Sequence, residues 1–146
     1  MRGDLPENLV MNATDPNMQP FFSHGGKLLL YHGWSDPNVP TVNTIKYYES
    51  VVDRLGGRGN AADRVRLFLA PGMGHCGGGE GPNLFDKVGA LERWVEQGQA
   101  PERLIASHSR DGKVDRTRPL CAYPQVARYK GAGSIDDAAN FVCRMP

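Results

Sequence analysis

Asp36 and His75 are the residues of this chain whose types and positions are best suited to chemistry. Asp36 lies in the segment HGWSDP, directly after a short apolar run, and His75 lies in PGMGHC, directly after another. A histidine can take a proton from a nucleophile when a carboxylate fixes its tautomer and stabilises its charged form. An acid followed by a histidine also matches the last two members of a triad in the order Ser…Asp…His. The pattern therefore predicts an acid and base pair for acyl transfer.

Both residues also have a simpler interpretation. Ser-Asp-Pro-Asn is a turn-forming sequence in its own right, so Asp36 need do no more than shape a turn. His75 is set among glycines and has no apolar face to pack on, which favours a chemical role. Ser35 lacks the second glycine of the Gly-x-Ser-x-Gly elbow, and no other serine lies in such an elbow. Ser35 is therefore interpreted as a residue that orients the loop, and the sequence contains no convincing nucleophile.

Other reactive residue types give weaker signals. The remaining histidines have no metal-ligand spacing with Cys76 or with one another, so no metal site is predicted; they are His24, His32 and His108. Trp34 either offers a platform for substrate or covers the edge of the core. Cys121 and Cys143 flank the C-terminal segment and are interpreted as a disulfide bridge, which leaves Cys76 as the unpaired cysteine of the three. The alternative is three unrelated buried thiols in a reducing compartment.

Two strands with a helix between them are needed to bring Asp36 and His75 together. The apolar run Lys27–Tyr31 predicts a strand covered on both faces, and the run Arg64–Ala70 predicts a second strand, with Val65, Leu67 and Leu69 pointing inward. Thr41–Leu55 has helical spacing, with Thr41 as N-cap and Gly56-Gly57 at its end. Strand, helix and strand of this length predict a right-handed βαβ unit with parallel strands. The acid and the histidine would then share the carboxyl edge of the sheet, where ligands collect in open α/β sheets.

The second half of the chain is less regular. Pro71–Pro82 contains six glycines and predicts a loop that turns sharply. A helix should follow, capped by Asn83, with Asp86 in its first turn and Gly98 at its end. Its predicted buried stripe is Leu84, Val88, Leu91 and Val95. A short strand is expected at Arg103–Ser107, and the remainder is predicted to be loop-rich with a small helix near Ile135–Phe141.

Composition narrows the class of protein. Residues 1–146 are expected to form a single domain, because 40% hydrophobic content is sufficient for one core at this length. The net charge of +1 provides no strong field to attract nucleic acid or an anionic membrane. No run approaches the ~18 apolar residues of a membrane helix, and the first 20 residues lack the features of a signal peptide. No nucleic-acid or membrane partner is therefore predicted.

Three long segments resemble the tannase and feruloyl esterase family of α/β-hydrolases, which includes enzymes that cleave mono(hydroxyethyl) terephthalate. They are GGKLLLYHGWSDPNVP, LFLAPGMGHCGGGEGPNLFDKVGALERWVEQGQAPERL and the tail RPLCAYPQVARYKGAGSIDDAANFVC. The resemblance extends from about Asn12 to Cys143. It implies an α/β fold, the C-terminal βαβα part of an α/β-hydrolase with a loop-rich, disulfide-closed C-terminal extension. It also implies Asp36 as the triad acid and His75 as the triad base.

The resemblance has further implications for cysteines, compartment and cofactors. In the family, the cysteine matching Cys76 bonds to one that precedes the serine, and the cysteines matching Cys121 and Cys143 form a second disulfide. Family members are secreted or periplasmic. The nucleophile elbow, the oxyanion loop and the lid domain, which binds the aromatic acid and in many members calcium, lie outside the segments that match. No cofactor is expected in this chain itself.

Two functions follow as hypotheses. The first is a carboxylic ester hydrolase that acts on aromatic-acid esters by a Ser-His-Asp mechanism, with this chain supplying acid and base but not the nucleophile. The alternative is a non-catalytic, truncated α/β-hydrolase module that folds and oligomerises or binds without hydrolysis. In either case an uncovered sheet edge predicts a homo-oligomer. The isolated chain is expected to have negligible esterase activity.

Overall fold

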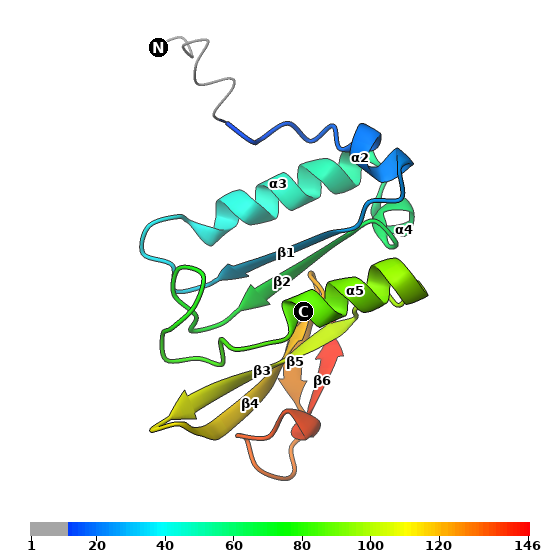
Figure 1. Cartoon of the computed structure of the whole chain (residues 1–146). Helices are drawn as coiled ribbons and strands as arrows, with labels where there is room; N and C mark the ends of the chain where they lie inside the picture. Colours follow the sequence, from blue (N-terminus) through cyan, green and yellow to red (C-terminus); the bar gives the residue numbers. More distant parts are fainter. Residues whose placement is uncertain (1–11) are drawn as a thin grey trace.

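The structure, a computed structural model, describes residues 12–146. The pairs Asp15-Pro16 and Gln19-Pro20 predict a turn-rich lead-in over residues 1–24, and the first 11 of these residues lie outside the described part. After a short helix α2 (Gln19–Ser23), strand β1 (Leu28–Gly33) leads through α3 (Thr41–Arg54) and α4 (Arg58–Ala61) to strand β2 (Val65–Ala70). β1 and β2 are parallel, which confirms that prediction (Figure 1). None of the helices within residues 12–146 has the length and apolar character needed to cross a bilayer.

The two parallel strands are buried to different extents. β2 lies between two clusters of buried residues, with Val65 and Leu67 in the cluster under α3 and Phe68 and Ala70 in the cluster on the other side. Val65 and Leu67 are buried as predicted, whereas Leu69, the third side chain predicted to point inward, is only partly buried. β1 is half-buried along its length, in contrast to the predicted cover on both faces. The reason is that β1 has a strand neighbour on one edge only within the described residues.

Helix α3 begins differently from the prediction. Its N-cap is Pro40, with no side-chain cap, and the Thr41 hydroxyl instead donates to the Gly33 carbonyl at 2.8 Å. The buried Thr41 side chain therefore connects the start of α3 to the end of β1 by a hydrogen bond. The predicted end of the helix is confirmed, since Gly56 adopts φ 83° and the Gly57 N–H donates to the Val52 carbonyl.

The predicted buried stripe of the next helix is wrong. Helix α5 spans Lys87–Gln97, is capped by the Asp86 carboxylate and buries Ala90 and Trp94. Val88 and Val95 are 63% and 58% exposed, and Leu84, which precedes the helix, is 57% exposed. The inward face is fixed by tertiary packing: Ala90 is small enough for close approach, and the Trp94 indole N–H donates to Asp63 Oδ1 at 3.0 Å. Gly98 ends the helix in the left-handed region, as predicted.

The C-terminal part contains two antiparallel hairpins, which corrects the loop-rich prediction. The expected third strand exists but is longer: β3 (Arg103–Arg110) pairs with β4 (Lys113–Cys121), and β5 (Val126–Tyr129) pairs with β6 (Phe141–Arg144). The turn between β3 and β4 is Asp111-Gly112, both at positive φ. The small helix expected near residues 135–141 is a single 3-10 turn, η1 (Ala138–Asn140).

A disulfide joins the two hairpins, and a short strand contact fastens the first of them to the parallel pair. Cys121 at the end of β4 is bonded to Cys143 in β6, as predicted. Just beyond β4, Ala122 forms a bridge with Phe68, and the Tyr123 N–H donates to the Leu67 carbonyl at 2.8 Å. These contacts place β4 against β2, so the β3–β4 hairpin and the parallel pair share one core.

Candidate active site

The loops after β1 and β2 leave the same edge of the parallel pair. Gly33 and Ala70, the last residues of the two strands, are register partners. Beyond them the loops stay joined, because the Trp34 N–H donates to the Ala70 carbonyl and the Ser35 N–H donates to the Met73 carbonyl, both at 3.0 Å. Parallel pairing therefore brings together two loops that are distant in sequence.

Gly33 sets how closely the two loops approach. A Cβ atom at this position would collide with the backbone carbonyl oxygens of Met73 and Gly74. Because those atoms are backbone, a side chain at position 33 requires one loop to move away from the other. The absence of a side chain at Gly33 is thus a condition for the geometry that follows.

Asp36 and His75 meet as the sequence predicted. His75 Nδ1 lies 2.7 Å from Asp36 Oδ2. The Asp36 side chain is 2% exposed, whereas the His75 side chain is 51% exposed. Asp36 also shapes its turn, since its Oδ1 accepts from the Asn38 N–H at 2.8 Å and the Val39 N–H at 3.0 Å. Asp36 therefore shapes its turn through Oδ1 and contacts His75 through Oδ2 at the same time.

The hydrogen bonds keep Asp36 ionised. Burial by itself raises the pKa of the Asp36 carboxyl, but the N–H groups of Val39 and Asn38, together with the hydrogen bond and charge of His75, hold it well below its ordinary value. An ionised carboxylate only accepts, so His75 Nδ1 carries a hydrogen. In the neutral ring Nε2 then has a free lone pair on the exposed side, which is the arrangement of a general base.

His32 is a part of the site that sequence reasoning missed. Its Nε2 lies 3.2 Å from Asp36 Oδ2 and 3.2 Å from the Val39 carbonyl, both acceptors, so this nitrogen carries a hydrogen. Its Nδ1 lies 2.6 Å from Thr44 Oγ1 on α3. Asp36 Oδ2 is therefore held between two histidines. The available signal was the position of His32, which lies at the end of a strand and four residues before the acid.

The other candidates lie outside this pair. Cys76 is an exposed free thiol with φ 61°, and Trp34 is 52% exposed rather than packed on the core. His24 Nδ1 contacts the Pro20 carbonyl, and His108 pairs with Asp115 on the β3–β4 hairpin. Among residues 12–146, no hydroxyl group is hydrogen-bonded to His75 Nε2, and no three His, Cys, Asp or Glu side chains are close enough to hold a metal ion.

Comparison with known proteins gives a consistent result. The profile described as "Tannase and feruloyl esterase" matches residues 4–144. The chain is 46% identical over 137 residues to a mono(2-hydroxyethyl) terephthalate hydrolase of Piscinibacter sakaiensis, covering 92% of this chain and 22% of that protein. It is 31% identical over 149 residues to feruloyl esterase B of Aspergillus niger, covering 91% and 29%.

Solved structures agree with these matches. Feruloyl esterase B from Aspergillus oryzae superposes with a TM-score of 0.80 at 28% identity, covering 90% of this chain and 29% of that one. Another esterase from Aspergillus oryzae gives a TM-score of 0.83 at 30% identity, covering 90% and 30%. The chain therefore spans less than a third of the length of each of these relatives.

The parallel strands, the acid and histidine at their carboxyl edge, and these structural neighbours define a protein of the α/β-hydrolase type. Within that class, the chain belongs to the tannase and feruloyl esterase family.

Proposed function

We propose that this chain supplies the acid and the base of a carboxylic ester hydrolase of the tannase and feruloyl esterase type. In this proposal it forms the C-terminal βαβα part of an α/β-hydrolase sheet, with the disulfide-closed hairpins as its extension. The observation that carries the proposal is the 2.7 Å contact between a buried carboxylate and a half-exposed histidine at the ends of parallel strands. Family membership supports the reaction class.

His75 would act as the base in both halves of the reaction. Its Nε2 takes the proton of a serine hydroxyl contributed by another segment of the complete enzyme, and the serine oxygen attacks the ester carbonyl carbon. When the tetrahedral intermediate collapses, Nε2 returns the proton to the departing alcohol. A water molecule then attacks the acyl-serine and loses its proton to Nε2. When this second tetrahedral intermediate collapses, the bond between the acyl carbon and the serine oxygen breaks, Nε2 returns the proton to the serine oxygen, and the carboxylic acid leaves. Asp36 holds the Nδ1–H tautomer and stabilises the imidazolium.

We propose esters of aromatic acids as the substrate class and a secreted or periplasmic location. The substrate class rests on the names of the relatives, a mono(2-hydroxyethyl) terephthalate hydrolase and feruloyl esterases. The location is supported by the disulfide between Cys121 and Cys143, because such bonds persist in oxidising compartments.

A chimaera tests the function. This chain replaces the matching segment of the Piscinibacter mono(2-hydroxyethyl) terephthalate hydrolase, and hydrolysis of that enzyme's named substrate is measured. We expect activity in the chimaera and a loss of several orders of magnitude in its His75→Ala variant. Ser35→Ala is the matched control and should keep its activity, since Ser35 contributes only a backbone hydrogen bond here.

Two outcomes contradict the proposal. A folded chimaera without hydrolysis, judged against the parent enzyme, favours the non-catalytic module. A robust ester hydrolysis by the 146-residue chain alone that disappears in His75→Ala would show that the chain contains its own nucleophile. We expect the chain alone to be inactive towards p-nitrophenyl esters.

We also propose that the isolated chain self-associates. Within the described residues β1 has one free edge, and Leu84, Val88, Val95 and Ile105 are exposed apolar side chains. Light scattering at micromolar protein should give a mass above that of one chain. A monomer mass that does not change with concentration would contradict this.

A further inference from the structure

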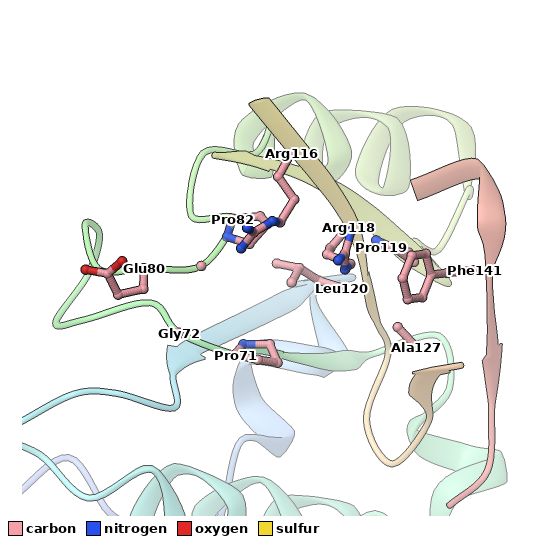
Figure 2. Close-up of a pocket in the computed structure, with 11 residues that line it drawn as sticks. Pro71, Gly72, Glu80, Pro82, Arg116, Arg118, Pro119, Leu120, Ala127 and Phe141 are labelled. Carbon is pink, nitrogen blue, oxygen red and sulfur yellow. The ribbon is translucent and has the colours of Figure 1, made fainter. Parts of the chain in front are cut away.

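A cavity of about 410 Å³ lies between the His75 loop and the two hairpins. Its loop wall is formed by Pro71 and Pro82, and its hairpin walls include Arg118 and Leu120 from β4 and Phe141 from β6 (Figure 2). Most of this lining is apolar. The volume is in the range of cavities that bind small organic molecules.

Arg118 provides the polar anchor of this cavity. Its guanidinium carbon lies 4.3 Å from the centre of the Phe141 ring, and its Nη1 donates to the Thr117 carbonyl at 2.8 Å. Among residues 12–146, no carboxylate forms a salt bridge with Arg118, so its other N–H groups are available. The adjacent Arg116 is engaged differently, because its Nε donates to Asp136 Oδ1 at 3.0 Å.

The charge around Arg118 is incompletely neutralised. Burial lowers the pKa of the Arg118 guanidinium, the positive charge of Arg116 lowers it further, and Asp136 offsets only part of this. Arginine nevertheless stays protonated in proteins. Glu80 lines the cavity, but Figure 2 shows its carboxylate lying apart from the two arginines. A ligand carboxylate would therefore relieve the positive charge of a partly desolvated guanidinium.

We propose that this cavity binds a small aromatic carboxylate. The carboxylate would accept a pair of hydrogen bonds from the free N–H groups of Arg118, whose planar fork matches carboxylate geometry. The aromatic ring would lie against the apolar walls formed by Pro71, Pro82 and Leu120. A bare inorganic anion would leave those walls in contact with water, and a neutral aromatic would leave Arg118 without a counter-charge.

The proposal stands on the cavity and does not require esterase activity. The acid released in the proposed reaction belongs to the same chemical class, so the cavity is a place where such an acid can be retained. Failure of the chimaera to hydrolyse its substrate would leave the binding result unchanged, and the two tests are therefore independent.

An NMR titration of the 146-residue chain with benzoate tests the proposal. The expected result is saturable shifts of the amide resonances of Gly72, Gly81 and Phe141, which line the cavity. Benzyl alcohol has the ring without the charge, and inorganic phosphate has the charge without the ring. Each should bind at least about tenfold more weakly, since a hydrogen bond to a charged group or burial of a ring contributes that much.

Matched variants identify the anchor. Arg118→Gln should raise the Kd for benzoate at least about tenfold, and Arg118→Lys, which keeps the charge without the fork, should have a smaller effect. Arg110→Gln is the control, because Arg110 is on the same hairpin with a side chain 74% exposed and should leave the Kd unchanged. Benzyl alcohol binding as tightly as benzoate, or equal Kd values for the chain and a folded Arg118→Gln variant, would overturn the proposal. Benzoate shifts confined to residues away from the cavity would also overturn it.

Discussion

Within residues 12–146, His75–Asp36 and His108–Asp115 are two histidine–aspartate pairs of almost the same length and opposite exposure. His75 and Asp36 are 2.7 Å apart, with the histidine side chain 51% exposed and the carboxylate 2% exposed. His108 and Asp115 are 2.6 Å apart, but here the histidine is 18% exposed and the carboxylate 33% exposed. The first pair joins the ends of two parallel strands, whereas the second lies across one antiparallel hairpin.

The two pairs share a lowered carboxyl pKa and differ in which partner is buried. Both carboxyl pKa values are lowered, that of Asp36 against burial by backbone and His75 hydrogen bonds, and that of Asp115 chiefly by the hydrogen bond from His108. A lowered carboxyl pKa therefore does not distinguish them. What distinguishes them is that Asp36 is buried behind the histidine, which leaves the His75 ring facing outward.

The largest expected difference between the pairs is in activity. In the chimaera, Asp36→Asn should lower kcat about 10⁴-fold, because the amide no longer enforces the Nδ1–H tautomer of His75. Asp115→Asn is the matched substitution in the second pair and should change kcat less than about twofold. Steady-state kinetics on both variants provide the measurement, and equal losses would show that the first pair has no special role.

The next largest expected difference is in stability. Phe68 in β2, the strand that leads into the His75 loop, is fully buried, so Phe68→Ala should cost about 3–5 kcal/mol. Val114, next to Asp115, is 61% exposed, and Val114→Ala should change stability by no more than about 0.5 kcal/mol. Urea unfolding measures both. Similar losses in the free energy of unfolding would mean that the residues next to the two pairs are equally well packed.

A smaller effect is expected at His32, which has no counterpart in the second pair. In the chimaera, His32→Leu should lower kcat about 10- to 100-fold with little change in KM, because Asp36 Oδ2 loses one of its two histidine donors and His75 is less well oriented. His32→Gln retains an N–H donor and should recover much of the loss. A merely structural role for His32 would instead predict equal activity for both variants once they are folded.

The smallest expected effect is the pH dependence of stability. A carboxyl with a lowered pKa in the folded state stabilises the fold at pH values above its unfolded pKa of about 3.9, and this contribution is lost as the pH falls towards the folded value. The destabilisation caused by Asp36→Asn or Asp115→Asn should therefore shrink between pH 5 and pH 2. Urea midpoints across this range test the prediction. A deficit that stays constant with pH would show that the carboxylate charge is not its cause.

The parallel pair and its two polar loops could be predicted because their signals are local. Continuous apolar runs mark β1 and β2, and the glycine-rich segment after β2 excludes regular structure. Parallel topology then places Asp36 and His75 at the same edge of the sheet, and Gly33 allows their loops to approach closely enough for contact. His32 was missed because its role depends on a side-chain hydrogen bond formed only after the turn at Asp36 has folded back on the strand.

Other elements were not predicted correctly, for different physical reasons. Helix α5 has apolar residues on two faces, and only contact with the sheet, including the bond from Trp94 to Asp63, decides that Val88 and Val95 face outward. The β3–β4 hairpin had a usable signal, since Asp111-Gly112 is a favoured two-residue turn. The first half of β3 was predicted from Leu104 and Ile105, but the start of β4 is polar, so hydrophobic alternation did not reveal its partner strand.

Gly33 links the architecture of the site to how its sequence is able to change. One hydrogen atom in place of a methyl group allows the two loops to touch, because any Cβ would meet the carbonyl oxygens of Met73 and Gly74. Even the methyl group of Gly33→Ala would push the loop of Asp36 away from the loop of His75, although neither residue is itself changed. If the pair acts in hydrolysis as we propose, the side chains around it are free to change during evolution, whereas position 33 is restricted to glycine.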